Sequence, residues 1–124
     1  MTAIATLAIV NLDCDDPPAL AQFYHDLLDW QITHSQDEYA MISDGTTSIG
    51  FGQIAGYEPP RWPDPSTPKR YHLDLYVDDL DKASTRCVEL GAVAAEFQPG
   101  GDRWRVLTDP AGHPFCICAK PQDG

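Results

Sequence analysis

The sequence predicts an α+β domain in which two pseudo-symmetric β-α-β-β-β modules form a curved, mixed sheet with the helices on the outside. Three observations support this fold class. An apolar alternation runs into an acidic pair twice, first at Asp15-Asp16 and again at Asp78-Asp79. A stretch with helical periodicity follows each pair. After each helix, a strand, a turn rich in Asp and Gly, and another strand follow in the same order.

Each predicted helix has a start signal and an apolar face. Asp16 and Asp79 are expected N-caps, because an aspartate oxygen can accept a backbone N–H of the first turn, where Pro17 also fits. Gly91 is expected to end the second helix. The apolar residues that recur at spacings of three and four are Leu20, Phe23, Tyr24 and Leu27 in the first helix, and Leu80, Ala83, Cys87 and Leu90 in the second.

The chain is expected to be one domain, residues 1–124, with module one at about 1–56 and module two at about 69–120. In each module a strand leads through a turn into another strand, from 39 to 53 and from 104 to 118. The linker at about 57–68 contains five prolines, which argue against helix and regular sheet. It is either a stiff spacer or a lid that carries Tyr57 and Trp62 over a pocket.

Charge and hydropathy exclude several classes of partner. With 19 acidic and 8 basic residues, the net charge of -11 repels a phosphate backbone, so no nucleic-acid partner is expected. The apolar runs are too short to span a membrane, and the first residues lack the basic and apolar regions of a secretory signal. We therefore expect a cytoplasmic protein whose cysteines are reduced.

Three segments carry a family resemblance: Asp13 to Trp30, His72 to Asp81, and Asp109 to Cys116. Together they resemble the vicinal oxygen chelate superfamily of glyoxalases, ring-cleaving dioxygenases and bleomycin-resistance proteins. Each motif is weak alone, but their order and spacing are specific and cover essentially the whole chain. The sequence is most similar to a glyoxalase-like subgroup. The resemblance implies a cup-shaped sheet that holds a ligand and a metal, and a homodimer, which open sheet edges would also favour.

Strand alternation predicts which side chains line the cup. On the strand from His72 to Val77, the alternate residues His72, Asp74 and Tyr76 are expected to face the cup. Superposing the two acidic pairs assigns the same face to positions 9, 11 and 13, and superposing the two hairpin turns pairs position 51 with 116 and 53 with 118. The predicted ligand-binding residues are Ile9, Asn11, Phe51, Gln53, Trp62, His72, Asp74, Tyr76, Trp104 and Cys116.

The resemblance also implies where a metal would bind, since metal-dependent members take one ligand from each first strand and one from each last strand. Those positions are Ile9, Phe51, His72 and Cys116. Only His72 and Cys116 can bind a metal, whereas a catalytic metal normally has about three protein ligands. Asp74 is expected to lie too far round on the strand of His72 to join them. No cofactor is therefore expected. The alternative is a divalent metal (Zn, Fe, Mn or Ni) held by His72 and Cys116.

Each candidate catalytic residue has a structural alternative. His72 is either a buried, hydrogen-bonded imidazole or a general base, because histidine exchanges protons near neutral pH. Asp74 either orients His72 or pairs with Arg103 or Arg105. Cys116 is either a nucleophile or a small residue that leaves room for a ligand. The aromatic residues Phe51, Trp62, Tyr76 and Trp104 form either a ligand-binding wall or core and dimer contacts.

Two functional hypotheses follow. The first is a metal-independent protein that binds a small organic molecule, favoured by the missing metal ligands at Ile9 and Phe51. The second is a metal-dependent lyase, isomerase or dioxygenase that uses His72 as ligand or base, supported by the polar cup lining. A thiol redox protein based on Cys116 and Cys118 is a weaker third, because such neighbours on a strand form a disulfide only with strain.

Overall fold

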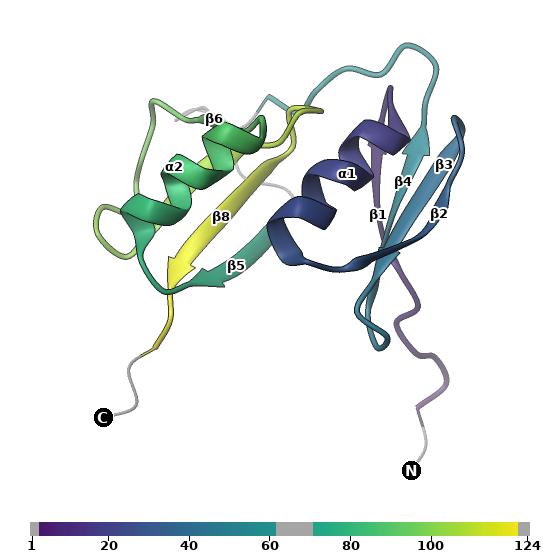
Figure 1. Ribbon diagram of the computed structural model, residues 1–124, viewed down its shortest axis with the longest axis horizontal. Coiled ribbons are helices and arrows are strands. Elements are labelled where there is room, and N and C mark those ends of the chain that lie inside the picture. The colour runs from purple at the N-terminus through teal and green to yellow at the C-terminus, as the bar shows by residue number, and fades with distance from the viewer. Residues whose placement is uncertain (1–2, 62–70, 122–124) are drawn as a thin grey trace. The chain divides into compact units, whose positions relative to one another are not determined.

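The computed structural model describes residues 3–61 and 71–121. Its contacts divide the chain into two units, residues 1–57, called module one here, and residues 58–124, called module two. Both modules have the predicted β-α-β-β-β order (Figure 1). Module one contains β1 (Val10–Cys14), α1 (Pro17–Leu28), β2 (Gln31–Ser35), β3 (Tyr39–Ser43) and β4 (Ser48–Gln53). Module two contains β5 (Leu73–Val77), α2 (Leu80–Leu90), β6 (Val93–Ala94), β7 (Trp104–Thr108) and β8 (Pro114–Ala119).

Each module forms its own mixed, four-stranded sheet. The strand order is β1-β4-β3-β2 in module one and β5-β8-β7-β6 in module two. The first and last strands of each module are parallel neighbours, whereas the remaining pairs are antiparallel. The two sheets therefore have the same topology, which confirms the predicted fold class and internal repeat.

The predicted helix starts are confirmed by their caps. The Asp16 carboxylate accepts the N–H of Ala19 at 3.2 Å, and the Asp79 carboxylate accepts the N–H of Lys82 at 3.0 Å. Each bond satisfies a donor that the first turn of a helix leaves without an intrahelical partner. Gly91 ends α2 with a φ of 121°, a conformation that glycine adopts without a steric cost.

In module one, α1 covers one face of the sheet through contacts with β2, β3 and β4. The centre of this interface is Tyr24, which is fully buried and stacks on Phe51 of β4 with ring centroids 5.7 Å apart. Further fully buried residues are Leu20 and Ala21 on α1, and Ala40 and Ile42 on β3. The alternation of β3 explains this core, because residues 40 and 42 point to the helix.

In module two, α2 contacts β6, β7 and β8. Leu107, Phe115 and Ile117 are fully buried, and the Arg105 side chain, in register with Ile117, pairs with Asp81 of α2 at 3.1 Å. These residues therefore belong to the helix-covered face of the sheet. On α2, burial raises the pKa of the Cys87 thiol, because removal from water disfavours the thiolate.

Two turns close the hairpins between β3 and β4 and between β7 and β8, and they differ in length. The first spans residues 44–47, and the second spans residues 109–113. Hydrogen bonds from the backbone N–H groups of Thr47 and Thr46 lower the pKa of Asp44. Asp109, only 3% exposed, accepts N–H groups of residues 111 and 113. In each turn, the carboxylate of one aspartate therefore accepts hydrogen bonds from backbone N–H groups of the turn and holds its shape.

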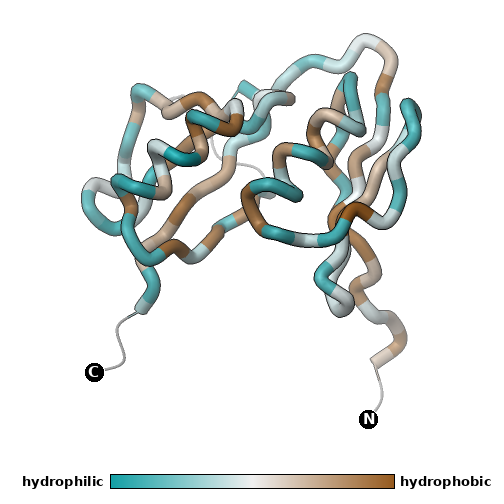
Figure 2. Tube along the Cα trace, viewed as in Figure 1, coloured by the Kyte–Doolittle hydropathy of each residue, from teal (hydrophilic) through white to brown (hydrophobic). Residues whose placement is uncertain are grey.

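Exposed apolar residues occur in both modules and include the segment before β1. Figure 2 shows hydrophobic residues along much of the segment before β1, where Ile4 and Leu7 are exposed. Among the described residues, no helix is long and apolar enough to cross a membrane.

Candidate functional site

The sheet face opposite the module's own helix, called the helix-free face here, carries the chemically active side chains of module two. Asp74 of β5 is the register partner of Cys116 of β8, and Tyr76 is the partner of Cys118. Paired residues of parallel strands project to the same face, and residues two apart on one strand do so as well. His72, directly before β5, thus joins Asp74 on this face.

His72, Asp74 and Cys116 form one cluster. His72 Nε2 lies 3.1 Å from Asp74 Oδ1, a hydrogen-bonding distance. The potential ligand atoms of all three residues lie within 4.8 Å of one another. The side chains of His72 and Asp74 are 17% and 63% exposed, whereas Cys116 is 1% exposed. The cluster therefore runs from a buried sulfur to a carboxylate at the surface.

An apolar group borders this cluster. Val106 of β7 and Cys116 are buried together, with Ala95, Trp104 and Cys118 packed against them. The indole of Trp104 lies against Gly100, where a Cβ atom would collide with the ring. This glycine lets the chain after β6 approach the aromatic ring closely. The helix-free face of module two thus combines an apolar floor with a polar pair.

Module one presents a different chemistry at the corresponding positions. Asn11 of β1 is the register partner of Gly50 of β4, as Asp74 is of Cys116 in module two. The Tyr39 hydroxyl donates to Asn11 Oδ1 at 3.3 Å, and these two oxygens occupy the space that a Cβ of Gly50 would need. The position that corresponds to Cys116 therefore has no room for a side chain.

The prediction that the side chains of Phe51 and Gln53 point into the cup, away from the helix, is wrong. Phe51 pairs in register with Leu12, is fully buried and stacks on Tyr24 of α1, so it faces the helix. Gln53 lies two residues after Phe51 on β4 and therefore belongs to the same face of the sheet. Its side-chain amide donates to the Asp15 carbonyl at 3.3 Å. The cause is the second turn, which is longer than the first by a single position, so the counterpart of Cys116 in module one is Gly50 and not Phe51.

The structure also corrects one expectation about Asp74 and bears on its two alternative roles. The sequence predicts that Asp74 lies too far round on its strand to join His72 and Cys116 as a metal ligand, yet its carboxylate belongs to their cluster. Of the two arginines that were alternative partners of Asp74, Arg105 pairs with Asp81. Asp74 instead contacts His72, as the alternative prediction of an orienting carboxylate requires.

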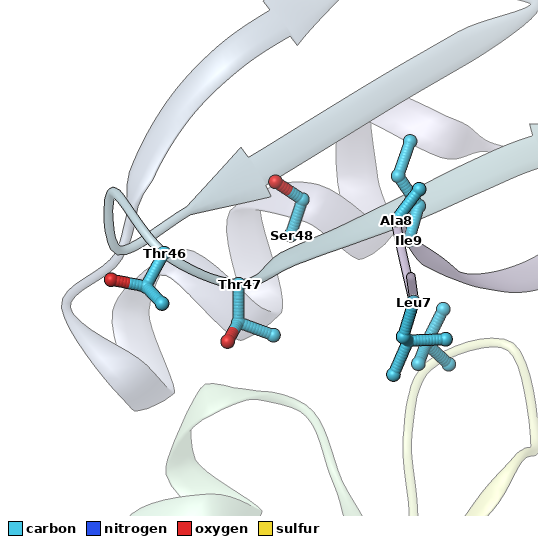
Figure 3. A pocket seen from close by; sticks show the side chains of 7 residues that line it. Leu7, Ala8, Ile9, Thr46, Thr47 and Ser48 are labelled. Atoms are coloured by element: carbon cyan, nitrogen blue, oxygen red, sulfur yellow. The ribbon is translucent and has the colours of Figure 1, made fainter. Parts of the chain in front are cut away.

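The other predicted ligand-binding residues lie in several environments. Tyr76 is 67% exposed on the helix-free face of module two, and Trp104 is half-buried there. Trp62 and most of the proline-rich linker lie outside the described residues. Ile9 lines a separate cavity of about 290 Å³ in module one, between the segment before β1 and the start of β4 (Figure 3). Its other lining residues are Leu7, Ala8, Val10, Thr46, Thr47 and Ser48.

Tyr39 is a residue of the helix-free face that sequence reasoning missed. Its hydroxyl contacts Asn11, and its ring lies 5.9 Å from that of His34. The signal was present in the alternation of β3, because the buried residues 40 and 42 leave 39, 41 and 43 on the opposite face.

A comparison with protein families decides the classification. The model of the glyoxalase-like domain matches residues 9–118. The chain belongs to this family. Glyoxalase-like domains are part of the vicinal oxygen chelate superfamily, so the resemblance expected from the sequence is confirmed. No curated protein matches the chain.

Several solved structures are similar to this glyoxalase-like chain over almost its whole length. A glyoxalase/bleomycin resistance protein/dioxygenase family enzyme from Burkholderia phytofirmans is 21% identical, with a TM-score of 0.68 over 93% of this chain and 98% of that one. The fosfomycin resistance protein FosX from Listeria monocytogenes is 14% identical, with a TM-score of 0.70 over 98% of both chains. The bleomycin-binding protein from Streptomyces verticillus, complexed with copper(II)-bleomycin, is 15% identical, with a TM-score of 0.58 over 96% of this chain and 100% of that one. At these identities the similarity establishes the fold.

The superfamily often uses metals, and the two modules of this glyoxalase-like chain differ in their capacity for one. Module two offers imidazole, carboxylate and thiol groups within 4.8 Å. Module one has Ile9, Asn11 and Gly50 at the corresponding positions, and neither isoleucine nor glycine has a ligand atom in its side chain. In module one, the positions that correspond to His72 and Cys116 therefore supply no side-chain ligand, whereas module two supplies three.

Proposed function

We propose that this glyoxalase-like protein binds a small organic molecule on the helix-free face of module two, with His72 and Asp74 as its polar anchor. The observation that carries the proposal is the contact between His72 and Asp74, 3.1 Å apart, beside the apolar group around Val106 and Trp104. Small-molecule sites are mostly apolar, with a few polar groups that fix the ligand's orientation. The bleomycin-binding protein from Streptomyces verticillus, which has a similar fold, supports the same class of function.

The chemistry of this face suggests what the ligand would offer. The Asp74 carboxylate accepts hydrogen bonds and is largely exposed, while His72 donates or accepts according to its tautomer. Tyr76 and Trp104 supply aromatic surface on the same face. The net charge of -11 disfavours an anionic ligand. We therefore infer a neutral or cationic molecule that has a planar apolar part and at least one hydrogen-bond donor.

This binding needs no catalytic metal of the kind that the superfamily holds with ligands from both modules. The side chains of Ile9 and Gly50 supply no donor atom for such an ion. His72, Asp74, Tyr76 and Trp104 are the residues of module two that we propose to contact the organic ligand, with the buried Cys116 next to Asp74 on the adjoining strand. In module one, Asn11 occupies the position that corresponds to Asp74.

A thermal-shift screen of aromatic metabolites and antibiotics, run with a chelator present, tests the proposal. A ligand at 100 times its Kd should stabilise the wild-type protein by about 2.7 kcal/mol. Substitutions His72→Ala and Asp74→Asn should weaken binding of the same ligand at least about tenfold, or 1.4 kcal/mol. His34→Ala, an exposed histidine in module one, is the matched control and should leave affinity unchanged. Equal affinity in all variants would contradict the proposed anchor.

A second candidate function is a metal-dependent lyase, isomerase or dioxygenase. The clustering of Asp74 with His72 and Cys116 favours it, since three donors are the usual number for a catalytic metal. These three residues would hold the ion, which supplies Lewis-acid polarisation of a substrate oxygen when bound. Turnover of a candidate substrate by metal-loaded protein, lost in His72→Ala and after chelation, would favour this function over simple binding.

Association into a homodimer, a cytoplasmic location and the organisation of both modules as one domain are further proposals. The edge strands β1 and β5 each have one described strand neighbour, and such edges favour pairing with another chain. Light scattering of the purified protein would give the mass of the particle, for which we expect two chains. A single cooperative unfolding transition would support one domain, and cell fractionation tests the location.

A further inference from the structure

The donor set of module two differs from that of an oxygen-rich metal site because it includes sulfur. His72, directly before β5, contributes an imidazole. Asp74 of β5 contributes a carboxylate and Cys116 of β8 a thiol on the same helix-free face. Donors around a tetrahedral zinc ion lie about 3.3–3.7 Å apart, given zinc–ligand distances of roughly 2.0–2.3 Å. The separation of 3.1 Å between His72 and Asp74, and the limit of 4.8 Å for all three donors, require only small side-chain movements to reach that spacing.

The three donors differ in solvent exposure, from the buried Cys116 to the largely exposed Asp74. Cys116 is 1% exposed and lies among apolar side chains, where a thiolate without a cation would be costly. A bound divalent ion removes this cost, since a coordinating thiol is deprotonated outright. His72 and Asp74 lie nearer to the surface, so the outer side of the cluster stays accessible to water or to a ligand.

The type of ion follows from the donors. Thiolate and imidazole favour zinc and similar thiophilic ions, whereas magnesium, calcium and manganese prefer carboxylates, carbonyls and water. In module one, Gly50 has no side chain at the position of Cys116, so the thiol of this donor set comes from module two.

We propose that His72, Asp74 and Cys116 form a three-ligand site for zinc or a closely similar thiophilic ion, contained within module two. The inference concerns the same His72–Asp74 pair as the proposed function, but it requires no organic ligand. The proposed site differs from the one that the superfamily resemblance implies. That site takes mainly oxygen ligands from both modules, whereas this one includes sulfur and lies within module two.

Cobalt(II) titration of the chelator-treated, reduced, full-length protein tests this site directly. Cobalt substitutes for zinc and reports a thiolate ligand by a charge-transfer band in the near ultraviolet. We expect one equivalent of cobalt to produce this band and one equivalent of zinc to abolish it. Manganese at the same concentration should not compete.

Variants identify the ligands. Cys116→Ser should remove the charge-transfer band, while the matched control Cys118→Ser, two residues further along β8, should keep it. Asp74→Asn changes a largely exposed side chain, so it should fold normally and bind cobalt at least about tenfold more weakly, as should His72→Ala. Circular dichroism of each variant without metal checks its folding.

Three results would overturn the site: no band in the wild-type protein, a band that persists in Cys116→Ser, or competition by manganese as strong as that by zinc. Because no organic molecule is present in this titration, and because the ligand screen is run with a chelator, the two proposals fail separately. A band without any ligand hit supports the metal site alone, and a ligand hit without a band supports organic binding alone.

Discussion

Phe51→Ala is expected to destabilise the protein strongly, because Phe51 is a core residue of module one. The side chain is fully buried and stacks on Tyr24 at 5.7 Å. Removal of a buried phenylalanine costs about 3–5 kcal/mol, of which the aromatic pair accounts for roughly 0.5–1.5 kcal/mol. For a chain of 124 residues, this loss should lower the midpoint of thermal unfolding by about 10–20 °C.

Chemical denaturation followed by circular dichroism measures the change, and Tyr76→Ala is the control. Tyr76 is an aromatic residue of similar size that is 67% exposed, so its truncation should cost less than about 1 kcal/mol. Suppose instead that Phe51→Ala kept its stability and lost affinity for a ligand. Phe51 would then belong to the ligand-binding face, and the register of β4 described above would be refuted.

Three further changes test other parts of the structure. Gly50→Ala should cost about 1–3 kcal/mol in urea denaturation, because its Cβ meets the Tyr39 hydroxyl, whereas Gly52→Ala, with no atom within 4 Å, should be nearly neutral. The lowered pKa of Asp44 means that its carboxylate stabilises the fold above its unfolded pKa, so the stability difference between wild type and Asp44→Asn should disappear as pH falls through the folded pKa. The raised pKa of Cys87 has the opposite effect on stability. The stabilisation by its thiol is fully present below the unfolded pKa and is lost as pH rises through the folded pKa, so the loss of stability at alkaline pH should be smaller in Cys87→Ala.

The fold was predictable because several independent signals in the sequence agree. The N-caps Asp16 and Asp79, the helix end at Gly91 and the apolar faces of both helices all occur where the sequence indicated. These features depend on local chemistry, such as hydrogen bonding of the first turn and the period of the helix. Because the sequence repeats, an element predicted in one module was also expected at the equivalent position of the other.

The face of β4 could not be predicted in the same way, because strand orientation depends on a single residue of register. The turn before β8 is one residue longer than the turn before β4, and this moved Phe51 from the expected ligand face to the helix-covered face. The partner of Asp74 was also ambiguous, since both the nearby arginines and His72 were plausible. Only the structure showed that Arg105 pairs with Asp81.

The central claim is that the helix-free face of module two is the functional site, and amide chemical shifts measured by NMR test it most directly. During titration with a ligand from the screen, or with zinc, the largest shifts should occur at residues 72–76 and 116–118, and His72→Ala should reduce them. The cavity of module one, lined by residues 7–10 and 46–48, provides the contrasting outcome. If the largest shifts occurred there and were unchanged in His72→Ala, the site proposed on module two would be wrong.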